Sequence, residues 1–261
     1  MHQNGIKLFN LPNLLTSANG IFGILAIILA FFGRLEMSAI CLIMAMVFDF
    51  FDGFTARLMG ITSPIGKDLD SLADMISFGL APGMLMFMTM ELRLNGNLSA
   101  VYQKYHTLNL HQLEDWISLS ALSIPFFSMF RLAKFNNDLR QSDRFIGLPT
   151  PANALLFLFF PLLLEQSTSN SITADSGVTY WLMHPWTMAT ICLCFPLLLI
   201  AEIPLLSLKF KHFQWRGNEL RWALLGISLI TIFPLRIYAI PIVILLYLIL
   251  SFIEQLIPQQ K

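Results

Sequence analysis

Apolar residues dominate this chain and occur in long runs that polar residues interrupt only briefly. One run extends from Ile21 to Phe32, and the 261 residues as a whole are 56% hydrophobic and only 12% charged, with a mean hydropathy of +0.68. Too few polar residues remain to cover the surface of a water-soluble domain, whereas a bilayer core requires roughly 20 apolar residues per helix. The sequence therefore predicts an all-α fold, a polytopic membrane helix bundle in which the bilayer is the solvent.

Eight membrane spans are predicted from this apolar pattern, within one membrane-embedded domain that covers residues 1–261. Their ranges are Leu11–Phe32, Ser38–Met59, Asp68–Leu92, Trp116–Phe135, Pro151–Leu164, Thr187–Leu206, Leu220–Leu235 and Ile237–Ile253. The first apolar run follows a long polar start and ends in Gly-Arg-Leu-Glu, so we interpret it as a span and not as a cleavable signal peptide. Pro234 and Arg236 interrupt the last apolar stretch, and one bent hairpin that does not fully cross remains the alternative there.

Positively charged residues are distributed unequally over the predicted loops. If the N-terminus is cytoplasmic, one side collects Lys7, Arg57, Lys67, Arg131, Lys134, Arg140, Arg144, Lys209, Lys211, Arg216, Arg221 and Lys261. The other side collects only Arg34, Arg93, Lys104 and Arg236. Because Lys and Arg accumulate on the cytoplasmic side, both termini are predicted to be cytoplasmic, in a membrane of the bacterial inner-membrane type. The polar loops near 93–115 and 165–186 face the other side and are expected to be plain connectors.

Four aspartates interrupt two consecutive apolar helices. Asp49 and Asp52 are three residues apart and share one helix face, and Asp70 and Asp74, four residues apart, share a face of the next helix. Gly, Ser and Pro residues break the chain between the two helices. The spacing predicts a helical hairpin whose four carboxylates converge near the cytoplasmic interface.

Converging carboxylates in a membrane repel one another, and either protonation or bound divalent cations would relieve this repulsion. An aspartate at the centre of a membrane helix costs about 3 kcal/mol, and ionisable residues inside membranes commonly mark functional sites. Carboxylates are ligands that Mg²⁺ prefers, and two such ions can act together on a phosphate. An ion pair between Asp49 and Arg57 is the structural alternative, but Arg57 and Lys67 cannot neutralise five aspartates once Asp68 is included. A metal site is therefore predicted, whereas the net charge of zero argues against nucleic acid as a partner.

Small residues accompany the aspartates. Gly53 and Ala56 lie on the first helix, and Gly66 lies opposite them at the start of the next. Residues with little or no side chain allow a flat ligand, such as a nucleotide, to approach the backbone, but they also allow membrane helices to pack closely. The pattern is compatible with both interpretations, and the neighbouring aspartates favour the ligand.

The complete pattern resembles the signature of a known enzyme family. It comprises Asp49-x-x-Asp52-Gly53-x-x-Ala56-Arg57 and, eight residues later, Gly66-x-x-x-Asp70-x-x-x-Asp74. These identities at this spacing match the CDP-alcohol phosphatidyltransferase family, whose members transfer a phosphatidyl group from a CDP-linked donor to an alcohol and release CMP. The resemblance implies a catalytic core of six helices at about residues 8–207, with about two additional C-terminal helices at about 218–256. It also implies a homodimer.

Further stretches resemble the integral-membrane subgroup of the family that uses L-serine as acceptor. They are "LPNLLTSANGIFG" at 11–23, "LDSLADMISFGLAPG" at 69–83, "FRLAKFNND" at 130–138, "FIGLPTPANA" at 145–154 and, more weakly, "IPLLSLK" at 203–209. Two alternatives remain open from the residues. One is the same chemistry with glycerol 3-phosphate or an inositol phosphate as acceptor, and the other is a cation-coupled transporter.

The resemblance implies a role for each matching residue. Asp49, Asp52 and Asp70 are implied ligands of two divalent ions, Mg²⁺ or Mn²⁺. Asp74 is implied as the general base and as an additional metal contact. The implied contacts to CDP-diacylglycerol are Asn13, Thr16, Gly53, Ala56, Arg57, Ser63 and Gly66.

The acceptor pocket is predicted less directly, from polar residues near the end of the fourth span. Arg131 is a candidate for binding the serine carboxylate, and Asn136 is a second candidate contact. Cationic residues at the cytoplasmic end of a membrane helix are also ordinary interfacial anchors. Both interpretations of Arg131 stay open at this point.

Overall fold

The computed structural model describes residues 9–60, 63–107, 113–138, 145–169, 177–206, 215 and 218–256. Its first half contains helices α1 (Leu11–Phe31), α2 (Leu35–Met59), α3 (Pro64–Asp74), η1 (a π-helix, Met75–Leu80), α4 (Ala81–Asn95) and α5 (Leu98–His106). Its second half contains α6 (Glu114–Ile117), η2 (Ser118–Leu122), α7 (Ser123–Asn137), α8 (Thr150–Ser169), α9 (Val178–Leu182), α10 (Pro185–Cys194), α11 (Leu197–Ile200), α12 (Glu219–Leu235), η4 (Arg236–Tyr238) and α13 (Ala239–Leu256). The only strands among these residues are β1 (Phe145–Ile146) and β2 (Pro204–Leu205), so the all-α prediction is confirmed.

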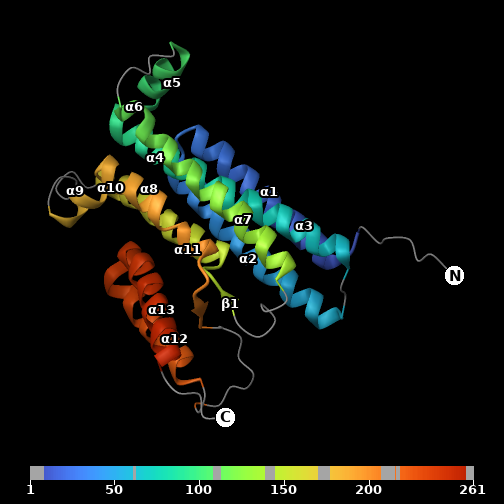
Figure 1. Ribbon diagram of the computed structural model, residues 1–261. Coiled ribbons are helices and arrows are strands. Elements are labelled where there is room, and N and C mark those ends of the chain that lie inside the picture. Colours follow the sequence, from blue (N-terminus) through green and yellow to red (C-terminus); the bar gives the residue numbers. More distant parts are fainter. Residues whose placement is uncertain are drawn as a thin grey trace.

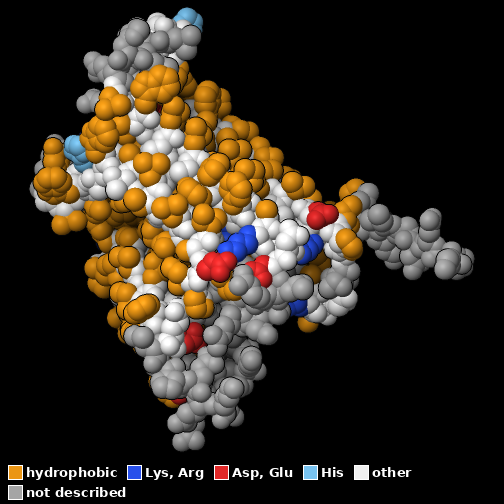
Figure 2. All heavy atoms as spheres, viewed as in Figure 1, with side chains coloured by type: hydrophobic (Ala, Val, Ile, Leu, Met, Phe, Trp, Pro, Cys, Tyr) orange, Lys and Arg blue, Asp and Glu red, His pale blue; other side chains and the backbone are white. Residues whose placement is uncertain are grey.

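The helices form a bundle whose outer surface is apolar. Four helical stretches of the described residues are long and apolar enough to cross a membrane, namely Leu11–Phe31, Leu35–Met59, Pro64–Asn95 and Glu219–Gln255. They contain the first three and the last two predicted spans. Large apolar side chains such as Ile21, Phe50 and Phe233 point outward and are 56%, 62% and 81% exposed, as expected of a lipid-facing surface. In Figure 2, hydrophobic side chains cover much of the visible face, and the charged side chains gather in its lower half.

Helix α1 contacts most of the other helices in the N-terminal part of the bundle. It packs along α2 and against α3, η1 and α4, while α8 packs on α2 and α4 (Figure 1). The contact with η1 is close because Gly23 has no side chain, and a Cβ built there would lie 2.8 Å from the Cα of Ser77. This packing fixes the position of α1 along its axis relative to the end of α3, where Asp74 lies.

The predicted sixth span is only partly helical. The helix ends at Ile200, after an interruption at Phe195 and Pro196, so the prediction of a span up to Leu206 is wrong at its C-terminal end. The next residues are extended, and β2 pairs antiparallel with β1 in the register Phe145↔Leu205. Apolar residues alone could not distinguish this short buried strand from a continuing helix.

The C-terminal stretch folds back on itself. Helices α12 and α13 lie side by side (Figure 1), and the reversal occurs at Arg236, whose φ of 48° is rare for a residue other than glycine. Pro234 precedes the reversal and cannot continue a regular helix. Both short helices of the prediction are therefore present as a helical hairpin.

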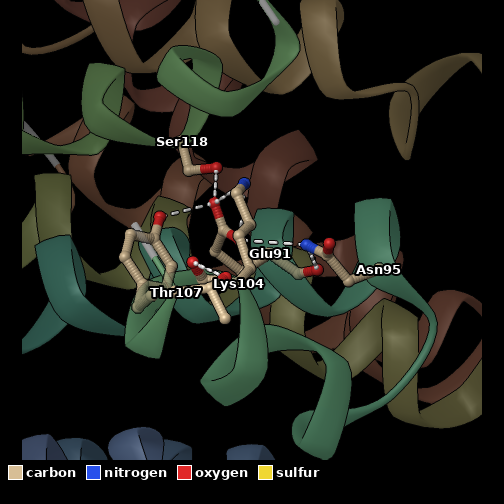
Figure 3. Close-up of polar contacts among 6 residues, drawn as sticks. Glu91, Asn95, Lys104, Thr107 and Ser118 are labelled. Atoms are coloured by element: carbon tan, nitrogen blue, oxygen red, sulfur yellow. Dashed lines mark hydrogen bonds and ion pairs between the residues drawn. The ribbon is translucent and has the colours of Figure 1, made fainter. Parts of the chain in front are cut away.

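A buried charged cluster occupies the far end of the long helix that contains α3, η1 and α4. Glu91 is fully buried, and its carboxylate accepts hydrogen bonds from Lys104 (3.2 Å), Tyr105 (2.9 Å) and Asn95 (3.0 Å) (Figure 3). The hydroxyl of Ser118 also donates to it. The connector expected near 93–115 therefore includes a helix, α5, that is held to the bundle through a buried ion pair.

The structure describes only some of the basic residues on which the orientation prediction depends. Lys7, Arg140, Arg144, Lys209, Lys211, Arg216 and Lys261 lie outside the described residues. The orientation of the bundle in the membrane therefore stays a prediction.

Candidate active site

The hairpin between α2 and α3 is built by local capping. Gly60 ends α2 in the left-handed conformation (φ 63°), and its N–H donates to the carbonyl of Ala56. Ser63 caps α3, since its Oγ accepts a hydrogen bond from the N–H of Gly66 at 3.0 Å, and Pro64 occupies the first turn. These residues fix where each helix ends and begins, and thus how the acidic faces of the two helices meet.

The acidic faces converge as the spacing predicts. Carboxylate oxygens of Asp49, Asp70 and Asp74 lie within 4.8 Å of one another. Asp52 is 5% exposed and its Oδ2 has no hydrogen-bond partner, although Thr16 lies within hydrogen-bond reach of this carboxylate. Among the described residues, no salt bridge joins any of these four aspartates to a lysine or arginine, so the alternative of an Asp49–Arg57 ion pair is wrong.

This donor set fits hard divalent cations. Three carboxylates within coordinating reach of one point, and a fourth with an unpartnered buried oxygen, would repel one another if no cation were bound. Carboxylate oxygens are the usual ligands of Mg²⁺ and Mn²⁺. The cluster therefore has the composition of a metal centre.

A cavity of about 740 Å³ opens beside the cluster. Its volume is in the range that holds small-molecule ligands and cofactors. Its lining comprises Pro12, Asn13, Thr16, Asp49, Phe50, Asp52, Gly53, Ala56, Arg57, Ser63, Pro64, Gly66, Lys67 and Asp70. All seven residues predicted to contact the CDP-linked donor belong to this set, and Arg57 and Lys67 give the cavity two cations.

The glycine at position 66 keeps one wall of the cavity open. A Cβ on Gly66 would lie 3.0 Å from the Oγ of Ser63 and 3.2 Å from the Oδ1 of Asn13. Both of those polar atoms line the cavity, so a larger residue would displace them or fill the space. Gly53 leaves more room, with Arg57 Nη1 at 3.5 Å from its hypothetical Cβ. The glycines thus bring a ligand close to polar groups of α1, α2 and α3.

Asp74 differs from the other three aspartates in its relation to the cavity. It is 9% exposed and is not part of the cavity lining, and its Oδ1 accepts a hydrogen bond of 3.2 Å from Nδ2 of Asn19. The π-helix η1 begins at the next residue, Met75, and such segments are frequent at functional sites.

Asn19 is a site residue that the sequence analysis missed. The signal was present, because Asn13, Thr16 and Asn19 form a polar stripe with spacing of three on an otherwise apolar helix. All three side chains are buried, and only Asn19 is wholly inaccessible.

The two predicted acceptor contacts are not in the cavity lining. Arg131 is 2% exposed, donates from Nε to the carbonyl of Leu148 at 3.1 Å, and stacks on Phe135. The side-chain Nδ2 of Asn136 donates to the Oγ of Ser71 at 2.7 Å. The backbone carbonyl of Asn136 accepts a hydrogen bond of 2.6 Å from Nζ of Lys67, which lines the cavity. Asn136 thus connects the end of α7 to α3, and acceptor binding by either residue stays a prediction.

Known proteins resemble the chain over the same region. The sequence profile of the CDP-alcohol phosphatidyltransferase family matches residues 9–253. The CDP-diacylglycerol–serine O-phosphatidyltransferase of Bacillus subtilis is 31% identical over 163 residues, which cover 60% of this chain and 81% of that protein. The protein of the same name from Methanocaldococcus jannaschii is 33% identical over 168 residues, covering 64% and 68%.

An archaetidylserine synthase of Methanothermobacter thermautotrophicus is 32% identical over 154 residues, which cover 58% of each chain. The family match extends over nearly the whole sequence and includes both helices that carry the aspartates. The chain is therefore an integral membrane protein of the CDP-alcohol phosphatidyltransferase family.

Proposed function

We propose that this protein transfers the phosphatidyl group of CDP-diacylglycerol to the hydroxyl of L-serine, giving phosphatidylserine and CMP. The convergence of Asp49, Asp70 and Asp74 beside the cavity carries the proposal for the chemistry. The serine acceptor is supported by the relatives, several of which are named CDP-diacylglycerol–serine O-phosphatidyltransferase. A transporter is not supported, because the family and these relatives are transferases.

The cavity is proposed to bind the head of the donor. Asn13, Thr16 and Ser63 offer hydrogen-bonding groups for the cytidine and ribose, while the Gly53–Ala56 edge and Gly66 leave space for them. Arg57 presents a planar cation that can pair with phosphate oxygens in a bidentate manner. The acyl chains remain in the bilayer, which the apolar outer face of the bundle contacts.

The aspartates are proposed to hold two divalent ions, Mg²⁺ or Mn²⁺. When bound, such ions neutralise the diphosphate and polarise the phosphorus that is attacked. Asp49, Asp52 and Asp70 would be their principal ligands, and Asp74 would contact one of them. By holding the ligands on two rigid helices, the hairpin orients the donor before the acceptor arrives.

Asp74 is proposed to remove the proton from the attacking hydroxyl. A serine hydroxyl is a weak nucleophile at neutral pH and requires a base within hydrogen-bond reach. Asp74 is largely buried beside the cavity lining, and Asn19 holds its carboxylate through a hydrogen bond. The hydroxyl then attacks in line and CMP leaves, with no covalent enzyme intermediate.

The wider organisation follows from the same proposal. The catalytic core would span about residues 8–207, and the α12–α13 hairpin would be an addition to it. We propose that the protein is a homodimer in a membrane of the bacterial inner-membrane type. The aspartate hairpin and both termini would lie on the cytoplasmic side, in contact with the solution that supplies serine and receives CMP.

The acceptor is tested by measuring CMP release from CDP-diacylglycerol with one alcohol at a time. Purified protein in detergent with Mg²⁺ receives L-serine, glycerol 3-phosphate or an inositol phosphate. We expect turnover with L-serine at least about tenfold above that with either phosphorylated alcohol, a difference of about 1.4 kcal/mol in transition-state binding. Turnover with glycerol 3-phosphate and none with serine would contradict the proposed acceptor.

A further inference from the structure

Asn19 leaves half of its amide group without a partner beside Asp74. The side chain is fully buried, and its Nδ2 donates to Asp74 Oδ1 at 3.2 Å. Its Oδ1 is buried and has no hydrogen-bond partner. A buried carbonyl oxygen without a donor costs roughly 1–3 kcal/mol, so such an atom in a native site requires an explanation.

The orientation of this amide is fixed by its neighbour. An ionised carboxylate only accepts hydrogen bonds, so the NH₂ group of Asn19 must face Asp74. The carbonyl oxygen is the other branch of the same planar amide, so it lies next to the Asp74 bond without taking part in it, and it requires a donor. Within the described part of the chain, no backbone or side-chain donor supplies one. A donor on a bound ligand would complete the hydrogen bonds of this amide.

The position of Asn19 restricts what that group is. Asn13 and Thr16, the two preceding members of the polar stripe on α1, line the cavity proposed for the donor nucleotide. Asn19 lies one turn further along the same face, beside the proposed base rather than in the cavity lining. Because its amide is hydrogen-bonded to Asp74, a ligand atom that pairs with the Asn19 oxygen would lie beside the carboxylate to which the attacking hydroxyl must come.

We propose that Asn19 is a specificity-determining residue that positions Asp74 through its NH₂ group and accepts a hydrogen bond from the ammonium group of the acceptor through its carbonyl oxygen. This inference rests on the proposed function. In a vicinal amino alcohol the hydroxyl and the ammonium lie on adjacent carbons, so both reach neighbouring acceptor atoms. The hydroxyl faces Asp74, and the ammonium faces the Asn19 oxygen.

The same arrangement selects against phosphorylated acceptors. A carbonyl oxygen offers no donor and no positive charge to a phosphate group, whereas it pairs well with an ammonium. A single buried amide would therefore both hold the base and favour an amino alcohol over glycerol 3-phosphate. Rejection of a ligand that leaves a buried polar group unpaired is an efficient form of selectivity.

The test compares Asn19→Leu with the wild type in steady-state kinetics. Leucine has a similar size and removes both hydrogen bonds. A hydrogen bond to a charged group is worth enough to change affinity by about 10- to 100-fold, so we expect the KM for serine to rise at least about tenfold. We also expect kcat to fall, because Asp74 loses its donor, and the KM for CDP-diacylglycerol to stay within about twofold of the wild type.

Asn95→Leu is the matched control. Asn95 also donates its amide to a buried carboxylate, that of Glu91, at 3.0 Å, but at the other end of the long helix (Figure 3). Its loss is expected to lower stability without changing either KM. Asn19→Ser retains a polar group that can accept a hydrogen bond, although one bond closer to the backbone. We expect its KM for serine to lie between those of the wild type and Asn19→Leu. This second variant keeps the inference testable if the leucine variant does not insert.

The outcomes separate this inference from the proposed function. If the Asn19 variants give a lower yield of active protein but retain both wild-type KM values, as is expected of Asn95→Leu, then Asn19 is only structural and the inference is wrong. If the wild type itself releases no CMP with serine, the proposed acceptor fails before any variant is compared. A selective rise in the KM for serine supports the inference.

Discussion

Asp74→Asn is expected to abolish CMP release while leaving the protein folded and inserted. Asparagine has nearly the same shape and can still meet Asn19, but it cannot accept a proton from the attacking hydroxyl. General-base catalysis contributes roughly 100- to 10,000-fold, so kcat should fall by at least about 1,000-fold when the weakened metal contact is included. The measurement is CMP release under saturating CDP-diacylglycerol and serine, with insertion checked by size-exclusion chromatography in detergent.

Asp68→Asn is the control for that experiment. Asp68 lies on the same helix and carries the same charge, but it is exposed and outside the carboxylate cluster. We expect its kcat to stay within about twofold of the wild type, since exposed charges contribute little. Equal losses in both variants, or an active Asp74→Asn enzyme, would show that Asp74 is not the base.

Removal of divalent cations is expected to reduce turnover to the background rate. Among the described residues, Arg57 and Lys67 are the lining cations of the cavity, and the four aspartates by themselves would repel the diphosphate of the donor. Activity in excess EDTA should therefore be undetectable, and Mg²⁺ or Mn²⁺ should restore it. The concentration of Mg²⁺ for half-maximal activity should rise at least about tenfold in Asp49→Asn and stay unchanged in Asp68→Asn.

Full activity in EDTA would contradict the metal centre directly. An Asp49→Asn enzyme with the same Mg²⁺ requirement as the wild type would show instead that the cluster is not where the metal binds.

The helical hairpin and its acidic faces could be predicted because they depend on local rules. The spacing of Asp49, Asp70 and Asp74 determines which face of a helix each one occupies, and Gly60 and Ser63 are common residues at helix ends. Convergence follows once two such helices are joined by a short turn. The spatial meeting of these carboxylates was therefore accessible from the sequence alone.

Other features depend on contacts between residues that are distant in the sequence. Asn19 and Asp74 are 55 positions apart, and Glu91 meets Lys104 and Ser118 only through the packing of α5 and η2. A loop with polar residues gives no sign that one of its lysines is buried against a membrane helix. Likewise, the strand β2 forms because β1 supplies its partner, which the apolar pattern of the sixth span could not indicate.

The most direct test of the account is calorimetric binding of CDP, the water-soluble part of the donor, to the purified protein. The central claim is that carboxylates of α2 and α3 hold cations that in turn hold the diphosphate. We expect CDP to bind in Mg²⁺ or Mn²⁺, to show no measurable binding in EDTA, and to bind at least about tenfold more weakly to Asp70→Asn. CDP binding of equal affinity with and without divalent ions, or to Asp70→Asn as to the wild type, would contradict the claim.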